Sequence, residues 1–163
     1  MQRFGRLDVM VNNAGVEHKM PFLDTPLDVW EEVLAVNLTG PWLGCQEAAR
    51  QMVGQGGRGR IINVSSVHED LAMPTNSPYC AAKGGLRMLT RTIAWSGRRT
   101  ASPSTTLPRA CPGRDRDPHG RPAGGERRPD VAKLLSEIPL GRMGHPEEVA
   151  ALWPCIWPPT PPT

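Results

Sequence analysis

The chain is 163 residues long, a length that suits one domain with a single hydrophobic core. Its formal net charge of +3 comes largely from arginines between positions 98 and 128, so it indicates no DNA-binding face and we expect no nucleic-acid partner. Proline and glycine, at 18 and 17 residues, crowd into positions 97–128 and the C-terminal end, whereas 1–94 has the composition of a normal globular segment.

The first predicted elements are a short strand and a long helix. Residues 7–11 form an apolar, β-branched run that ends in the polar turn Asn12–Gly15. A helix is predicted over 28–53, with Asp28 as its N-cap and a bend near Gly40 and Pro41. Its apolar residues keep roughly helical spacing and are Val29, Val33, Val36, Leu43 and Ala48.

A second strand and a second helix follow. The strand covers 61–64 and ends at Ser65 and Ser66, and Ser77 is expected to cap a helix over 78–94. The predicted buried stripe of that helix consists of Ala82, Leu86, Leu89 and Ile93. Strands that alternate with helices favour a parallel α/β sheet, in which ligands bind beyond the carboxyl ends of the strands. Both polar turns, after Val11 and after Val64, fall at that edge.

The cysteines and histidines give no sign of a metal site. Cys45, Cys80, Cys111 and Cys155 lie far apart without a C-x-x-C pair, so we expect reduced thiols rather than disulfides or metal ligands. His18 and His145 have no site context, and we expect both to be solvated surface residues. The sequence shows no signal peptide and no apolar run that could span a bilayer, so we expect a cytoplasmic protein without membrane contact.

Tyr79 and Lys83 form the most chemically suggestive pair. They are four residues apart on the predicted helix, so their side chains share a face. The ammonium group of Lys83 favours the phenolate and moves the pKa of Tyr79 from about 10 toward the working pH. Tyr79 is therefore a candidate general acid/base for a carbonyl/alcohol couple, and Ser66 could hydrogen-bond the same substrate oxygen. Alone, this spacing is weak evidence, because many helices contain it by chance.

Four motifs occur together in one order. They are N-N-A-G at Asn12–Gly15, N-L-T-G at Asn37–Gly40, N-V-S-S at Asn63–Ser66 and Y-x-x-x-K at Tyr79–Lys83. In this order and spacing they resemble the short-chain dehydrogenase/reductase family, over about 1–94 and 129–152. The resemblance implies a Rossmann-like α/β fold with a doubly wound parallel sheet, of which this chain would hold the catalytic half. It also implies NAD or NADP as the cofactor and a small alcohol or carbonyl compound as the substrate.

The resemblance assigns roles to four catalytic residues. Tyr79 would transfer the proton, and Ser66, thirteen residues before it, would orient the substrate oxygen. Lys83 would lower the pKa of Tyr79 and hold the nicotinamide ribose hydroxyls. Asn37 would lie at the helix bend and fix a water molecule in the proton relay.

The same resemblance assigns the turn after the first strand to the cofactor. Asn12, Ala14 and Gly15 match the positions beside the cofactor, where a small residue lets the ribose approach the backbone. Tyr79 and Lys83 would also contact the cofactor, whereas Asn13 is expected to be structural. Family members are commonly homotetramers that pack the Tyr/Lys helix and its long neighbour against a partner subunit, so the resemblance suggests a homotetramer.

Within the family, the sequence is most similar to glucose 1-dehydrogenases. The matching stretches are Asn12–Glu17, Asn37–Gly40, Ile62–Glu69, Tyr79–Gly85 and Pro146–Ala151. This likeness places Glu17 and His68 near a sugar pocket, although both are equally compatible with ordinary loop positions. A reductase of 3-oxoacyl or other carbonyl compounds is the alternative within the family.

The sequence departs from the family in two ways. The glycine turn that receives the pyrophosphate in this family does not occur in 1–94, so we expect the first half of the fold to be missing. From Trp95 the run 95–110 loses the family pattern, but the neighbouring reading frame permits the family-like V-E-R-A-P-H-G-I-x-V-N-N-V-A-P-G. The interpretation is therefore an in-frame core at 1–94, an out-of-frame loop at 95–128, a family-like helical segment at 129–152 and an out-of-frame tail at 153–163.

Two functional hypotheses follow. The first is an oxidoreductase that moves a hydride between NAD(P) and the CH–OH group of a sugar-like substrate. The second is a catalytically inactive fragment, or a product that binds a protein partner through exposed sheet edges. We expect descent from an enzyme and inactivity for this precise polypeptide. With only two candidate core strands, we also expect marginal stability or aggregation.

Overall fold

The computed structural model divides the chain into two compact units, Met1–Arg109 and Ala110–Thr163. In the first unit the structure describes residues 4–57, 59–97 and 104–109. In the second unit it describes Arg142, His145, Glu147 and Glu148. Most of the predicted helical segment 129–152 and all of the tail 153–163 therefore lie outside the described residues.

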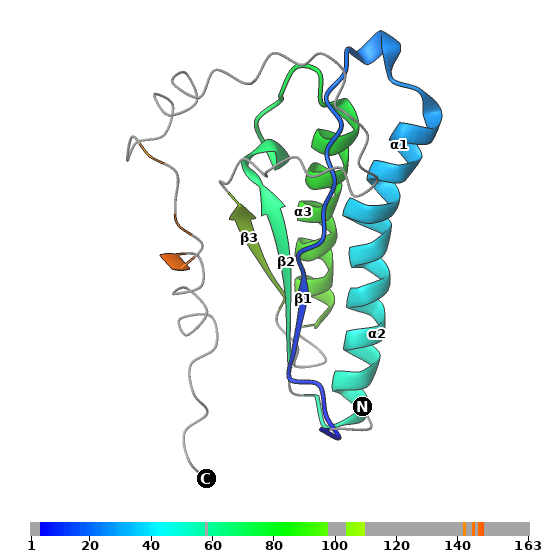
Figure 1. Cartoon of the computed structure of the whole chain (residues 1–163). Coiled ribbons are helices and arrows are strands. Elements are labelled where there is room, and N and C mark those ends of the chain that lie inside the picture. The colour runs from blue at the N-terminus through cyan, green and yellow to red at the C-terminus, as the bar shows by residue number, and fades with distance from the viewer. Residues whose placement is uncertain are drawn as a thin grey trace. The chain divides into compact units, whose positions relative to one another are not determined.

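The first unit contains a three-stranded parallel sheet with helices packed beside it (Figure 1). Its strands are β1 (Val9–Asn12), β2 (Arg60–Ser66) and β3 (Ser104–Arg109), in the spatial order β1-β2-β3. The register pairs Val11 with Ile62 and Val64 with Leu107. The predicted parallel α/β architecture is thereby confirmed.

Strand β3 corrects the expectation of a loop over 95–128. Ser104–Arg109 pairs with β2 along its length, so the sheet has one strand more than the two that the sequence suggested. Two threonines in the segment are β-branched and suit an extended backbone. Pro108 lacks an N–H, which is tolerated because β3 is the outermost strand of the described sheet.

The predicted helix over 28–53 is three consecutive segments. They are α1 (Leu27–Leu34), a π-helical turn (Ala35–Thr39) and α2 (Gly40–Gly54). The widened turn lies just before the predicted bend, and Pro41 follows in the first turn of α2, where its missing N–H costs little. Asp28 is not the N-cap as predicted. Pro26 precedes the helix, and the Asp28 carboxylate accepts a hydrogen bond from the adjacent Val29 N–H at 2.9 Å.

Helix α3 (Ser77–Gly97) matches the prediction in extent but not in its cap. Ser77 is the first helical residue, and its buried hydroxyl has no hydrogen-bond partner in the described part of the chain. The buried stripe includes Ala82 and Leu86 as predicted, but it continues through Thr90, which is 3% exposed. Leu89 is only half-buried, since it lies one position away from that stripe.

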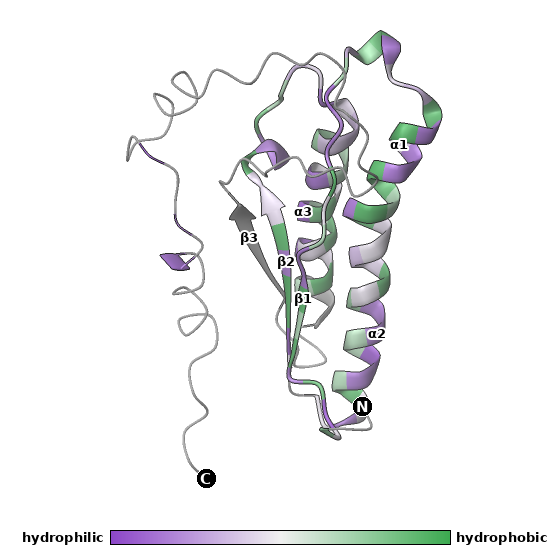
Figure 2. Ribbon diagram, viewed as in Figure 1, coloured by the Kyte–Doolittle hydropathy of each residue, from purple (hydrophilic) through white to green (hydrophobic). Residues whose placement is uncertain are grey.

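Both long helices cover the same face of the sheet. The Asn63 side chain of β2 contacts Cys45 on α2 and Thr90 on α3, so these helices lie on the side to which Asn63 points. The apolar core on this side consists of Cys45, Ala48, Met52 and Ile61. Met10 of β1 packs against this core, and Figure 2 shows apolar colouring along both β1 and β2. Burial of this core fixes the sheet against the helices.

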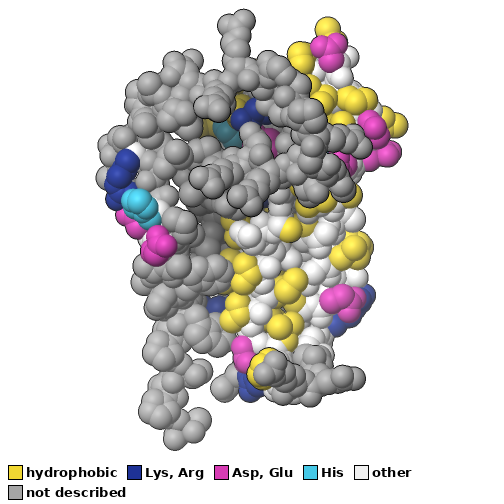
Figure 3. All heavy atoms as spheres, in the orientation of Figure 1, with side chains coloured by type: hydrophobic (Ala, Val, Ile, Leu, Met, Phe, Trp, Pro, Cys, Tyr) yellow, Lys and Arg dark blue, Asp and Glu magenta, His cyan; other side chains and the backbone are white. Residues whose placement is uncertain are grey.

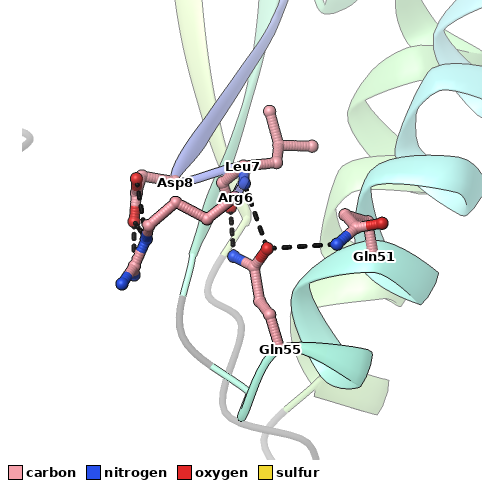
Figure 4. A network of polar contacts seen from close by, with 5 residues as sticks. All are labelled: Arg6, Leu7, Asp8, Gln51 and Gln55. Carbon is pink, nitrogen blue, oxygen red and sulfur yellow. Dashed lines mark hydrogen bonds and ion pairs between the residues drawn. The ribbon is translucent and has the colours of Figure 1, made fainter. Parts of the chain in front are cut away.

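A polar network ties the start of β1 to the end of α2 (Figure 4). The Gln55 amide accepts a hydrogen bond from the Leu7 N–H at 3.0 Å and donates to the Leu7 carbonyl. Gln51, one turn earlier, donates to Gln55 at 3.2 Å, and Arg6 forms an ion pair with Asp8 alongside. These contacts lie at the end of the sheet opposite to the predicted site.

The outer surface of the helical layer is partly apolar (Figure 3). Leu43, which the helical spacing had assigned to the buried face, is 48% exposed, because the π-helical turn rotates α2 relative to α1. Leu27 and Trp42 are exposed as well. Within the described part of the chain, none of the helices is both long enough and apolar enough for a membrane span.

Candidate active site

The turn after β1 and the π-helical turn meet at the carboxyl edge of the sheet. Asn37 is fully buried, and its amide donates to the Val16 carbonyl at 2.7 Å while its oxygen accepts from the Val16 N–H at 2.9 Å. Gly15 packs against the same side chain, since a Cβ at this position would lie 3.2 Å from Asn37 Oδ1. Asn37 therefore fixes the backbone of the turn that the sequence assigned to the cofactor.

Lys83 reaches the same turn from helix α3. Its Nζ donates to the Val64 carbonyl of β2 at 3.0 Å and lies 3.8 Å from the position of a Cβ on Gly15. The side chain is 4% exposed, so the ammonium group is held between the two strand ends rather than in solvent. This position lets Lys83 link β2, α3 and the turn after β1.

Tyr79 lies one turn before Lys83, and the Lys83 Nζ is 5.5 Å from the centroid of its ring. The rings of Tyr79 and His68 meet edge to face at a centroid distance of 6.4 Å. Ser66 ends β2 and is 4% exposed, and its hydroxyl accepts a hydrogen bond from the His68 N–H at 3.3 Å. The structure thus brings Gly15, Val16, Asn37, Tyr79 and Lys83 together, and we name these five residues the catalytic cluster.

Asn12 points away from this cluster. Its amide nitrogen donates to Asn63 Oδ1 at 2.8 Å and also contacts the Pro41 carbonyl and Cys45 Sγ, each at 3.4 Å. Asn63 in turn donates to Thr90 Oγ1 at 2.9 Å. We name Asn12, Cys45, Asn63 and Thr90 the inner cluster, because they lie between the sheet and the helices. Any contact of Asn12 with a cofactor would have to come from its backbone.

The remaining predicted residues lie on the loops around the catalytic cluster. Ala14 is exposed in the turn between Asn12 and Gly15. Glu17 accepts a hydrogen bond from Asn76 Nδ2, and its carboxylate lies 3.8 Å from Lys19 Nζ. His68 Nδ1 is 3.0 Å from the Leu71 carbonyl.

The described residues contain no group of histidine, cysteine and acidic side chains that could hold a metal ion. His18, expected to be solvated, is half-buried, and its Nε2 lies 3.2 Å from a Glu32 carboxylate oxygen. In the second unit His145 is exposed and its N–H donates to Glu148 at 2.7 Å. The Arg142 guanidinium, bonded to the same carboxylate, lowers the pKa of Glu148 to about 2.

Sequence reasoning missed three residues in and around these clusters. Asn63 stood in the N-V-S-S motif without a role of its own, and Thr90 looked like an ordinary helix position. Their pairing depends on how α3 crosses β2. Asn76 stands three residues before Tyr79, where asparagine normally suggests a helix cap. The sequence could therefore have pointed to Asn76, but not to the pairing of Asn63 with Thr90.

A family model described as short chain dehydrogenase matches residues 1–106. The chain belongs to this family. The match spans both strand-end turns and the Tyr79/Lys83 helix, which are the elements that build the catalytic cluster.

Similar proteins include oxidoreductases of several names. An uncharacterized oxidoreductase, YohF, from Escherichia coli is 41% identical over 95% of this chain and 60% of its own length. Glucose 1-dehydrogenase 2 from Bacillus subtilis is 35% identical over 93% of this chain and 57% of its own length. A crystal structure of a gluconate 5-dehydrogenase from Burkholderia cenocepacia in complex with NADP and tartrate superposes with a TM-score of 0.63 at 38% identity, covering 66% of this chain and 42% of that one.

These matches cover only part of each relative. The chain spans about 60% of the length of the curated relatives. The likeness therefore shows the family and does not show the activity of the whole proteins. The structural match at 38% identity confirms the short-chain dehydrogenase type of Rossmann fold.

Proposed function

We propose that this chain is the catalytic part of an NAD(P)-dependent oxidoreductase that interconverts a hydroxyl and a carbonyl group on a small substrate. The observation that carries the proposal is the convergence of Asn37, Tyr79 and Lys83 on the turn at Gly15. The loop after β1, the π-helical turn and helix α3 supply these residues, so their meeting depends on the fold rather than on one motif.

The residues at the turn suit a nicotinamide ribose. The missing side chain of Gly15 leaves its backbone open beside a buried ammonium group, whereas a Cβ would approach Asn37 Oδ1 to 3.2 Å. Lys83 carries N–H donors that can hold ribose hydroxyls. Asn12, Ala14 and Gly15 would form the turn against which the cofactor lies. NAD(P), when bound, supplies the nicotinamide that accepts or returns the hydride.

The proton step falls to Tyr79. Its phenolate would accept the proton from the substrate hydroxyl, and the nearby Lys83 ammonium favours that ionised form. Ser66, at the end of β2, would donate a hydrogen bond to the same oxygen. Asn37 would keep the turn at Val16 in place and fix the water of the proton relay.

For the substrate we propose a sugar-like polyol, with Glu17 and His68 beside it. Glucose 1-dehydrogenase 2 and gluconate 5-dehydrogenase are both named for polyhydroxylated substrates, which supports this class without selecting a compound. A ketone of another kind, including a 3-oxoacyl compound, is the alternative within the family. The polar loop residues around Tyr79 favour the polyol.

The proposal also covers the cellular compartment and the oligomeric state of the protein. Cys45 and Cys80 are free thiols, which suits a reducing cytoplasm. The exposed apolar side chains on α1 and α2 would be covered in a homotetramer, since Leu27, Trp42 and Leu43 are otherwise open to solvent.

The decisive experiment compares the chain with its Tyr79→Phe variant. NAD(P)H fluorescence titration should show cofactor binding in both, because Phe keeps the ring and removes only the hydroxyl. In a full-length, frame-corrected version, Tyr79→Phe should lower the turnover of a polyol by at least about a thousandfold, since the proton acceptor is lost. Retained turnover in the variant would overturn the mechanism.

A second candidate function follows from β1, which has a partner on only one side in the described sheet. Such an edge offers backbone N–H and C=O groups to an extended strand of another protein. This alternative predicts that the chain fails to bind NAD(P)H in the same titration. Saturable cofactor binding would rule out a purely protein-binding role.

A further inference from the structure

The loop after β1 and the loop before α3 are joined at two points near Tyr79. The Asn76 amide donates to the Glu17 carboxylate, and the Met20 N–H donates to the Thr75 carbonyl at 2.8 Å. We call this pair of contacts the loop clasp. It connects segments more than fifty residues apart in sequence, immediately before the helix that carries Tyr79.

The Asn76 side chain bonds to Glu17 and does not cap the N-terminus of α3. It stands directly before the first residue of α3, where an asparagine oxygen usually accepts a hydrogen bond from the first turn of the helix. The carboxylate of Glu17 can only accept, so the amide nitrogen of Asn76 must face it and the oxygen must face away. That oxygen is buried and has no hydrogen-bond partner in the described part of the chain. The side chain thus serves the opposite loop rather than its own helix.

The backbone beside Asn76 is strained. Thr75 has a φ of 65°, in the left-handed region that β-branched residues rarely adopt. Its carbonyl is the group that accepts from Met20, so the clasp holds the conformation that the residue disfavours. The strained backbone at Thr75 is therefore tied to the loop after β1.

We infer that Glu17 and Asn76 position Tyr79 for proton transfer by holding the first turn of α3 against the loop after β1. The inference rests on the proposed function and adds two positioning residues to it. The same loop carries Gly15, which lies against Lys83 one turn further along the helix. Tyr79 therefore lies between two attachment points, Asn76 before it and Lys83 after it.

The test uses the full chain with Glu17→Leu, which cannot accept a hydrogen bond, and Glu17→Gln, which can. Hydrogen exchange is measured at the first turn of α3, including the Cys80 N–H that donates to the Asn76 carbonyl at 3.0 Å. Exchange there should accelerate at least about tenfold in Glu17→Leu and stay within about threefold in Glu17→Gln, since loss of about 1.4 kcal/mol corresponds to tenfold. Lys19→Met is the matched control, because it removes only the 3.8 Å charge contact and should leave exchange unchanged.

A second readout reports on Tyr79 itself, the only tyrosine in the chain. Its phenol can be titrated by ultraviolet absorbance without interference from another tyrosine. Loosening of the first turn separates the ring from Lys83, so the titration midpoint should rise in Glu17→Leu and not in Glu17→Gln.

Asn76→Ala tests the same contact from its other side if Glu17→Leu does not fold. It should accelerate exchange to a similar extent, and the double variant Glu17→Leu/Asn76→Ala should be little worse than either single change. Equal exchange in Glu17→Leu and Glu17→Gln, or fully additive effects, would overturn the clasp. Neither readout needs cofactor or turnover, so failure of the dehydrogenase proposal in Tyr79→Phe is detected separately.

Discussion

The catalytic cluster and the inner cluster both bury asparagine, but they satisfy it in different ways. Asn37 in the catalytic cluster bonds to the backbone of Val16, in a turn whose outer side is exposed at Ala14. Asn63 in the inner cluster bonds to the side chains of Asn12 and Thr90 and lies in the packed layer. Buried polar side chains therefore shape the proposed active-site turn in one place and hold strands against helices in the other.

This difference suggests that the inner cluster serves stability and the catalytic cluster serves function. A backbone partner leaves the turn at Gly15 and Val16 with a defined shape while its other side stays open to a ligand. Side-chain partners on β1 and α3 make Asn63 a fastener between elements, because each donor and acceptor lies on a different segment. Substitutions in the inner cluster should accordingly affect folding first, and those in the catalytic cluster should affect function first.

The largest expected effect is that of Asn63→Leu on stability. The change leaves the half-buried Asn12 amide without its shortest hydrogen bond and removes the donor to Thr90 Oγ1. Loss of buried hydrogen-bond partners should lower the free energy of unfolding by about 2–4 kcal/mol. Urea denaturation followed by circular dichroism measures this change.

Asn13→Ala is the matched control for Asn63→Leu. Asn13 is exposed directly after Asn12 at the end of β1, and the change should alter stability by less than about 0.5 kcal/mol. Equal destabilisation by both variants would mean that the inner cluster does not fasten the sheet.

Two glycine substitutions, one at each cluster, test the same comparison with smaller expected losses of stability. A Cβ on Gly44 would lie 2.6 Å from Asn12 Oδ1 and 2.9 Å from Met10 Cε, so Gly44→Ala should cost about 1–3 kcal/mol of stability. A Cβ on Gly15 would lie 3.2 Å from Asn37 Oδ1 and 3.8 Å from Lys83 Nζ. Gly15→Ala should therefore leave stability within about 1 kcal/mol but weaken NAD(P)H binding roughly tenfold.

Denaturation and fluorescence titration together test this division. Gly54→Ala at the end of α2, where a Cβ meets nothing within 4 Å, serves as the neutral control. A Gly15→Ala protein that loses stability but binds cofactor normally would contradict the separation of the two clusters.

The sequence indicated the catalytic cluster better than the inner cluster. Asn37, Tyr79 and Lys83 stand in motifs whose spacing is local, so the order of residues along the chain is enough to identify each of them. The contact between Asn63 and Thr90 depends on strand register and helix crossing, which no short motif encodes. Asn12 belonged to a recognised motif, yet its side chain faces the inner layer, because only the register of β1 decides which face each residue occupies.

The elements themselves were predictable to a similar degree. The apolar runs of β1 and β2 and the stripe of α3 identified the sheet and helix order. The π-helical turn at Ala35–Thr39 has no local signature other than the following Gly40 and Pro41. Strand β3 was missed because its six residues hold a single apolar side chain besides Pro108, so only pairing with β2 makes it a strand.

The smallest expected effect is an alkaline loss of stability through Cys45. Burial raises the pKa of the Cys45 thiol, and its hydrogen bonds with the Asn63 and Asn12 side chains oppose this only in part. The folded protein therefore holds this proton at a pH where the unfolded chain has released it. Its contribution is complete below the ordinary thiol pKa of about 8.5 and is lost as the pH rises through the folded value.

Denaturation midpoints of the chain and of Cys45→Ala between about pH 7 and 10 test this assignment. The decline of stability above about pH 8.5 should be shallower in Cys45→Ala, since the variant has no buried proton to lose. Cys80→Ala is the matched control, because that thiol is only half-buried on α3 and should leave the slope unchanged. An identical slope in all three proteins would show that Cys45 is open to solvent, and the inner cluster would then not be the closed layer that Asn63 fastens.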